Sequence, residues 1–221
     1  MRRTSLFPVL FALALVLSCA SPKPQETPPD VSGIRTVLVL PFQDMAAALG
    51  TGQQVRSSLS GKMFVTGEVG PGGPGFLTTQ VFEFMEKSSG YQVLSPEGAR
   101  SLRSAVAGPG GKLESEREVI PEMGRRVKAD AVLAGYVYRY RDRLGNAYSV
   151  ENPASVAFEL CLVRSSDGRM LWSGRHDETQ SALSDNLLKA PEFVKRGGKW
   201  ITADALAREG LDRVLKDFPK P

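Results

Sequence analysis

The segment Ala129–Gln180 constrains the fold most strongly, because its apolar and polar residues alternate over two long runs. Period-two alternation bounded by turn residues is typical of half-buried antiparallel strands. A four-residue turn ending in Asp167-Gly168 separates the second run from Leu171-Trp172 and favours a hairpin there. The segment therefore predicts a three-stranded meander. The residues expected on one face of the first run are Val132, Ala134, Tyr136, Tyr138 and Tyr140, and those of the second are Val156, Phe158, Leu160 and Leu162.

The residues before this segment predict alternating strands and helices. Val37–Leu40 is a continuous β-favouring run ended by Pro41, as expected for a strand covered on both faces in an α/β sheet. Helical spacing with one buried stripe is predicted for Leu77, Val81, Phe84 and Met85. The other expected elements are a helix over 45–49, a hairpin or irregular strand over 62–69, a strand over 91–94, a helix starting at 95–97 and a helix capped at 115–118.

The remainder of the chain predicts one more long helix. Thr202 is a suitable N-cap, and Ala207, Leu211, Val214, Leu215 and Phe218 keep helical spacing up to Pro219. Between the meander and this helix, Pro191 interrupts the segment 181–196 and Gly197-Gly198 ends it. Together with the central strand, this order predicts an α/β domain over residues 34–221.

The first residues predict export rather than folded structure. Arg2 and Arg3 precede the apolar run Leu6–Leu17, which is too short for the ~20 residues that span a bilayer. The following Val16–Ala20 resembles a bacterial lipobox, which implies cleavage before Cys19 and lipidation of its thiol. A cleaved secretory signal that happens to end in cysteine is the alternative. We expect a signal peptide over 1–18 and a lipidated, proline-rich tether over 19–33.

Cysteine count, net charge and the glycine-rich segments limit the classes of function further. The chain has two cysteines, so lipidation of Cys19 leaves Cys161 without a disulfide partner, and its position between Leu160 and Leu162 predicts a buried thiol. The formal net charge of +4 gives no basis for nucleic-acid binding. The glycine-rich segments Gly70–Gly75 and Gly108–Lys112 lack a phosphate-loop pattern and predict turns or mobile loops.

The sequence shows no arrangement typical of an enzyme. The single histidine, His176, lies beside Asp177 and Glu178, but Ser173 would point to the opposite face of the same strand, away from the imidazole. One histidine and one available cysteine do not make a metal site. We therefore expect no cofactor, no metal and no small-molecule substrate.

Two surfaces are candidates for contact with a partner or a membrane. The first is the stripe Tyr136, Tyr138 and Tyr140, which is either an aromatic contact surface or a sheet face covered by a helix. The second is the loop of Lys195, Arg196, Lys199 and Trp200, which is either a plain basic loop or an interfacial patch for anionic lipid or polymer.

The order of these elements resembles a superfamily of envelope lipoproteins. It includes the curli secretion channel, the lipoprotein activator of penicillin-binding proteins and the amino-terminal domain of the Tol-Pal propeller protein. The matching pieces are Val37–Phe42, Tyr91–Ser95, Ala129–Gly135 and Gly168–Trp172. The resemblance implies a single α/β domain with a mixed sheet of about five strands flanked by helices, a C-terminal antiparallel meander and a C-terminal helix.

The chain departs from two members of this superfamily. Residues 62–75 are too short and too rich in glycine and proline for the barrel hairpins of the curli channel, and the tether is shorter than that of the activator. We therefore expect a non-catalytic lipoprotein that acts as an interaction or assembly module. It would be anchored in the outer membrane through Cys19 and would face the periplasm. Its expected partner is an envelope protein or another copy of itself. An oligomeric subunit of a secretion or transport complex is the alternative, and an enzyme is a third.

Overall fold

The computed structural model describes residues 30–95, 98–107, 115–181 and 196–221. Its main sheet has the strand order β10-β9-β6-β1-β5, and β2 pairs with β6 beside this path. The strands are β1 (Thr36–Val39), β2 (Gln43–Asp44), β5 (Gln92–Leu94), β6 (Ala131–Arg141), β9 (Ser155–Arg164) and β10 (Met170–Thr179). β1 is parallel to β5 and β6, whereas β6, β9 and β10 form the antiparallel meander. The predicted mixed α/β sheet is confirmed.

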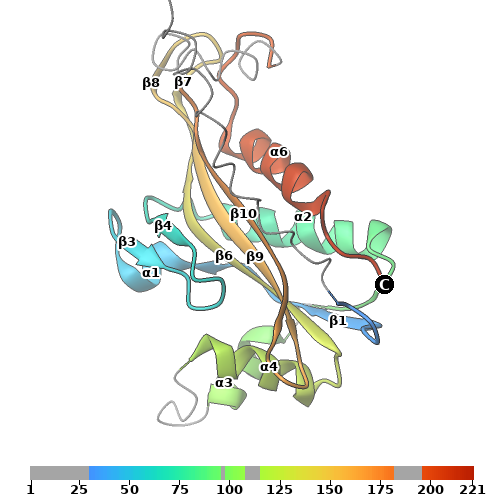
Figure 1. Cartoon of the computed structure of the whole chain (residues 1–221). Helices are drawn as coiled ribbons and strands as arrows, with labels where there is room; N and C mark the ends of the chain where they lie inside the picture. Colours follow the sequence, from blue (N-terminus) through green and yellow to red (C-terminus); the bar gives the residue numbers. More distant parts are fainter. Residues whose placement is uncertain (1–29, 96–97, 108–114, 182–195) are drawn as a thin grey trace, which may run out of the picture.

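Helices cover both faces of the sheet (Figure 1). On one face lie α2 (Gly73–Ser88) and α6 (Ala203–Leu215), whose buried stripes include Leu77, Val81, Leu206 and Leu211. On the other face lie α1 (Met45–Leu49), α3 (Ala99–Ala107) and α4 (Glu116–Arg126). Each of these two layers has its own apolar core, and together the cores bury most residues of β1, β6 and β9.

The helix ends follow the expected capping chemistry. Asp44, Ser115 and Thr202 each accept a hydrogen bond from a backbone N–H in the first turn of the helix that follows. Pro121 lies inside α4 rather than at its start, and it is buried there.

A β-bulge in β6 changes which face its tyrosines occupy. The register with β9 shifts between Val137 and Arg139, so Tyr138 is an extra residue without its own partner. As a result Tyr136 and Tyr138 face the α4 side, whereas Tyr140 faces α2 and α6. The prediction that all three share one face is therefore wrong for Tyr140.

The prediction of a turn or loop over Gly70–Gly75 is correct only for the first part of the segment. Helix α2 begins at Gly73, with Pro74 in its first turn, where a missing N–H costs nothing. A Cβ atom at Gly73 would lie 2.6 Å from Cγ of Tyr140, so the glycine allows α2 to pack directly on that ring. The segment Gly108–Lys112 lies outside the described residues.

Two small hairpins complete the fold. β3 (Gln54–Arg56) pairs with β4 (Met63–Val65) and lies on the α4 side of the sheet. The sequence predicted a hairpin or irregular strand over 62–69, and of the two strands only β4 falls in that range. β7 (Leu144–Gly145) pairs with β8 (Val150–Asn152) and extends beyond the long strands β6 and β9 at one end of the molecule (Figure 1). We call this second hairpin, together with residues 197–200, the tip.

Candidate functional site

The three tyrosines of the predicted stripe do not form an exposed aromatic surface. Tyr136, Tyr138 and Tyr140 are all buried, and each hydroxyl donates a hydrogen bond to a carboxylate, from Glu116, Glu159 and Asp204 respectively. Burial, reinforced by the neighbouring carboxylate, raises the pKa of each phenol above its ordinary value. These side chains join the sheet to its covering layers, and the layer over Tyr138 is Phe64 of β4 instead of a helix.

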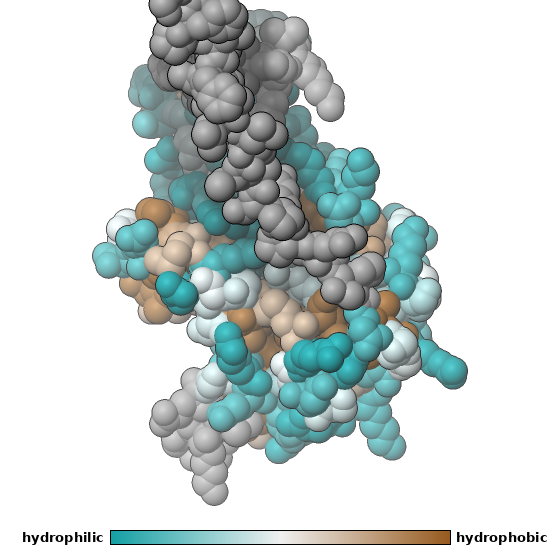
Figure 2. Space-filling model, in the orientation of Figure 1, coloured by the Kyte–Doolittle hydropathy of each residue, from teal (hydrophilic) through white to brown (hydrophobic). Residues whose placement is uncertain are grey.

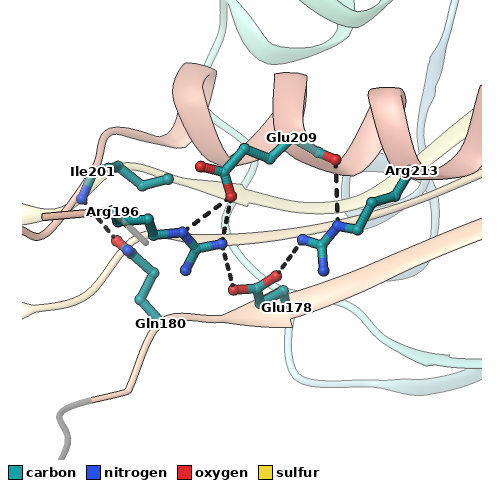
Figure 3. Close-up of polar contacts among 6 residues, drawn as sticks. All are labelled: Glu178, Gln180, Arg196, Ile201, Glu209 and Arg213. Atoms are coloured by element: carbon teal, nitrogen blue, oxygen red, sulfur yellow. Dashed lines mark hydrogen bonds and ion pairs between the residues drawn. The ribbon is translucent and has the colours of Figure 1, made fainter. Parts of the chain in front are cut away.

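The predicted basic loop is only partly a surface patch. Arg196 is buried in an ion-pair network, in which its guanidinium lies 2.9 Å from Oε1 of Glu178 and 2.6 Å from Oε2 of Glu209 (Figure 3). Arg213 contacts the second oxygen of Glu178 at 2.7 Å. Burial alone would raise the pKa of Glu178, but the two arginines outweigh it and lower that pKa. Arg196 therefore holds α6 against β10 instead of facing a membrane, and Lys195 lies outside the described residues.

Lys199 and Trp200 lie at the tip, where they contact residues of the β7–β8 hairpin region that the sequence analysis did not place near them. The backbone N–H of Trp200 donates to Ala147 O at 2.9 Å, and the Trp200 carbonyl accepts from the guanidinium of Arg143. The ammonium of Lys199 lies 5.8 Å from the ring centroid of Tyr148. Tyr148 and Leu144 are 74% and 55% exposed, the two highest values among the described large hydrophobic residues. The tip thus combines exposed apolar and aromatic groups with cations.

A second exposed apolar patch lies on the lobe formed by α1, β3 and β4. Leu49, Met63 and Val65 are 47%, 38% and 49% exposed. Figure 2 shows hydrophobic side chains gathered over this lobe, at the left of the view. It carries no aromatic side chain among those exposed residues, which distinguishes it from the tip.

His176 is not part of a catalytic triad. It is 6% exposed, packs 5.3 Å from the ring of Phe158, and its Nε2 has no hydrogen-bond partner among the described residues. Burial, followed by the positive charge of Arg213, lowers the pKa of His176 to about 4, so the imidazole is neutral at neutral pH. Ser173 lies on the other face of β10, where its hydroxyl contacts the Lys62 ammonium at 3.1 Å.

Several clefts have the size of ligand sites, and two of them are lined by residues of the main sheet. One, of about 440 Å³, follows strand β10 from Trp172 to Glu178 and is closed on one side by Arg213, Val214 and Asp217 of α6. The other, of about 360 Å³, lies where β1 ends, between Leu40–Asp44 and Arg103. Arg103 is already paired with Glu116 at 2.5 Å, and Asp44 caps α1. Neither cleft presents a nucleophile beside a base within the described residues.

The remaining expectations concern cysteine, metal and membrane. Cys161 is fully buried and unbridged, as predicted, and burial raises the pKa of its thiol, with the Glu159 carboxylate adding to the effect. Cys19 lies outside the described residues. Within the described ranges no group of three or more metal-ligating side chains occurs. None of the helices in those ranges is both long and apolar enough to cross a bilayer.

The most buried acidic group, Glu159, was missed by sequence reasoning. It is fully buried in β9, where its two oxygens accept from Tyr138 at 2.7 Å and from Ser60 at 2.6 Å. The signal was available, because Glu159 is the one charged residue inside the apolar run 155–163. Its donors could not be inferred, since Ser60 is distant in the sequence.

Comparisons with known proteins assign no family to the chain. No family model matches the chain, and no curated protein matches it. Among solved structures, the PelC dodecamer protein from Paraburkholderia phytofirmans shares 14% identity over 85% of this chain and 89% of its own, with a TM-score of 0.48. The lipoprotein GNA1162 from Neisseria meningitidis shares 20% identity over 71% and 93%, with a TM-score of 0.40. The LpoB C-terminal domain from Salmonella enterica shares 14% over 67% and 87%, with a TM-score of 0.39. At such values no activity, partner or assembly passes to this chain.

Proposed function

We propose that this protein is a non-catalytic lipoprotein of the bacterial envelope that presents its tip to a protein partner. The observation that carries the proposal is the gathering of Leu144, Tyr148, Lys199 and Trp200 at one end of the molecule. Exposed aromatic groups with adjacent cations are typical of contact surfaces. The tyrosines, the histidine and Arg196 are instead used inside the fold, which leaves the tip as the better surface.

Asp30, where the described chain begins, and the tip lie at opposite ends of the long strands. The Asp30 carbonyl accepts from Arg164 at 2.9 Å, and Arg164 pairs with Ala131 at the start of β6. The tip follows Arg141, at the end of the same strand. Ten residue steps at ~3.4 Å separate these ends by about 34 Å.

The tether has a similar reach. From Cys19 to Asp30 an extended chain at ~3.1 Å per residue covers at most about 34 Å. An anchored domain would therefore carry its tip away from the lipid surface more readily than into it. This favours a protein partner over headgroups, and the composition of the tip favours a partner surface that is apolar with nearby acidic side chains. By analogy with the enteric lipoprotein sorting rule, Ala20 rather than Asp after Cys19 favours the outer membrane, and we propose that the anchor lies there.

Site-specific photocrosslinking in the native membrane tests this function. A photoreactive residue at Tyr148 should give an adduct with one envelope protein, and Leu144→Ser should reduce that adduct severalfold. Val65, which is 49% exposed on the other apolar patch, is the matched control position. An adduct at Val65 with none at Tyr148 would place the contact on the lobe and refute the tip. Independently, Cys19→Ser should release the protein from the membrane or leave its precursor uncleaved.

A further inference from the structure

Strand β10 is an edge strand whose outer side pairs with no other strand of the described structure. Gln180 N–H donates to Ala154 O at 3.0 Å, which marks that residue pair as hydrogen-bonded. In an antiparallel ladder hydrogen-bonded and non-hydrogen-bonded pairs alternate. The backbone groups of residues 173, 175, 177 and 179 therefore point outward. The Ser173 carbonyl agrees, because it accepts from the Lys62 ammonium at 3.5 Å instead of from β9.

The charges along this edge are self-complementary. Arg175 and Asp177 are both exposed, lie on the same face of β10, and flank His176. If a second copy adds its β10 antiparallel around a two-fold axis at His176, each Arg175 lies directly opposite the Asp177 of the other copy. Opposite charges in directly facing positions stabilise an antiparallel pair.

The same charges disfavour the neighbouring registers. A residue whose backbone N–H and C=O point outward must face a residue of the other copy whose backbone groups also point outward. An antiparallel register can therefore shift only in steps that keep such residues opposite each other. One such step places Arg175 opposite Arg175, and the step in the other direction places Asp177 opposite Asp177. Like charges directly opposite are destabilising. Charges on an edge strand usually prevent pairing of any kind, whereas this pattern permits one register.

The cleft beside β10 adds an independent observation. It follows the strand on the α6 face, and His176 lines it with an Nε2 that has no hydrogen-bond partner among the described residues. The two-fold register brings the two His176 side chains to facing positions on this face. Each buried imidazole then gains a polar neighbour from the other copy.

We propose that a second copy of this chain binds along β10 in an antiparallel two-fold register, with Arg175 of each copy facing Asp177 of the other. This names one partner of the interaction module and so rests on the proposed function. It uses a surface separate from the tip, so a dimer could present two tips.

Disulfide trapping with the full-length chain in detergent tests the register. Arg175→Cys and Asp177→Cys are purified separately with tags of different mass. Facing residues in such a pair have Cα atoms about 5.5 Å apart, within disulfide range. Residues offset diagonally lie about 7–8 Å apart, where a disulfide is strained or impossible. Under mild oxidation the mixture should therefore give a covalent heterodimer, and neither variant alone should do so. The wild-type chain measures any background from Cys19 and Cys161.

Two outcomes would overturn the proposal. Efficient crosslinking of Arg175→Cys alone indicates the shifted register, and no heterodimer in the mixture, with both variants folded by circular dichroism, excludes the interface. Because this experiment contains neither membrane nor other proteins, its failure leaves the tip adduct of the proposed function unaffected.

Charge reversal provides a second measurement that does not depend on cysteine. Asp177→Arg should weaken dimerisation about tenfold or more, since like charges then face each other twice. The double variant R175D/D177R restores opposite charges and should recover the dimer. Both proteins lose the 2.7 Å contact between Arg139 and Asp177. The double variant also restores opposite charges at the 2.8 Å contact between residues 175 and 177 within one copy, so the unfolding free energy of both variants is measured beside dimerisation to separate the two effects. If the double variant remains as monomeric as Asp177→Arg, the proposed register is wrong.

Discussion

The hydroxyl of Tyr138 donates to Oε1 of Glu159 at 2.7 Å, inside a layer where Glu159 has no exposed surface. The ring of Tyr138 stacks on Phe64 with a centroid distance of 3.9 Å, and the guanidinium of Arg175 covers the other side of Phe64 at 4.6 Å. Ser60, from the same hairpin, supplies the second donor to Glu159. One buried carboxylate thus ties β3 and β4 to the central strands.

Removal of the Tyr138 hydroxyl should destabilise the protein. Tyr138→Phe keeps the stacking on Phe64 but leaves one oxygen of a buried acid without its donor, which costs about 1.5–3 kcal/mol for a hydrogen bond to a charged group. Urea unfolding followed by circular dichroism measures the loss. Tyr148→Phe, on the exposed tip, is the control and should change stability by less than about 0.5 kcal/mol. Equal effects of the two substitutions would contradict the role given to Glu159.

Much of the architecture could be predicted because it depends on local patterns. The apolar run at Val37–Leu40, the helical stripe from Leu77 to Met85 and the cap at Thr202 each specify their element from a few adjacent residues. The tyrosine stripe shows where this reasoning ends. A period-two pattern assumes an unbroken ladder, and the bulge at Tyr138 turns Tyr140 to the other face.

The site depends on contacts between distant residues, which a single sequence does not show. Nothing near Arg196 indicates that Glu178 and Glu209 neutralise it, since the three residues come together only when α6 packs on β10. Likewise Trp200 meets Ala147 across a long stretch of chain. Residue type alone assigned Arg196 and Lys199 to one basic patch. Only the packing of the folded chain shows that the Arg196 side chain is buried and Lys199 is exposed.

Arg196 and Lys199 should therefore respond differently to truncation. Arg196→Ala leaves Glu178 with Arg213 as its remaining partner in a position where Glu178 and Arg196 are both 8% exposed, and loss of one member of a buried pair costs up to about 3–5 kcal/mol. Lys199→Ala should change stability little. Thermal unfolding of both variants compares them. If Arg196→Ala does not change the thermal unfolding of the protein, the arginine is solvated, as expected for a plain basic loop.

His176 should make stability depend on pH. Its folded pKa of about 4 lies below the ordinary 6.5, so the unfolded chain binds more protons between these values. The His176 contribution should therefore fall as the pH drops from 6.5 toward 4, by at most about 3 kcal/mol, and stay level below that window.

The variant His176→Phe isolates this contribution. It removes the Nε2 atom, which has no hydrogen-bond partner in the part of the chain that the structure describes, and keeps an aromatic ring beside Phe158. Urea unfolding at pH 7.5 and pH 5 should show a smaller loss for the variant than for the wild type. The interval lies above the range in which Asp177 and Glu178 titrate, because both of their pKa values are lowered. Parallel loss in both proteins would mean that His176 is already protonated when folded.

Gly210 should resist a substitution that normally stabilises a helix. Replacing glycine by alanine inside a helix gains about 1 kcal/mol. At Gly210, however, a Cβ atom would lie 2.6 Å from Cγ and Cδ2 of the His176 ring. We expect Gly210→Ala to destabilise the wild type and to stabilise His176→Ala, which a double-mutant cycle by urea unfolding measures. The same sign in both backgrounds would show that the helix, not the ring, determines the effect.

The length of the tether should matter little for a partner that the tip can reach. Residues 19–30 extend at most about 34 Å, and the long strands carry the tip about as far again from Asp30. A flexible insert after Pro29 should weaken the Tyr148 adduct only modestly, because it lowers the effective concentration of the tip near its partner. Halving the tether should preserve the adduct if the partner lies within one domain length of the membrane. Photocrosslinking yield from Tyr148 in each tether variant, normalised to membrane-bound protein, provides the measurement. If halving abolishes the adduct while the insert increases it, the partner lies farther from the membrane than this geometry allows.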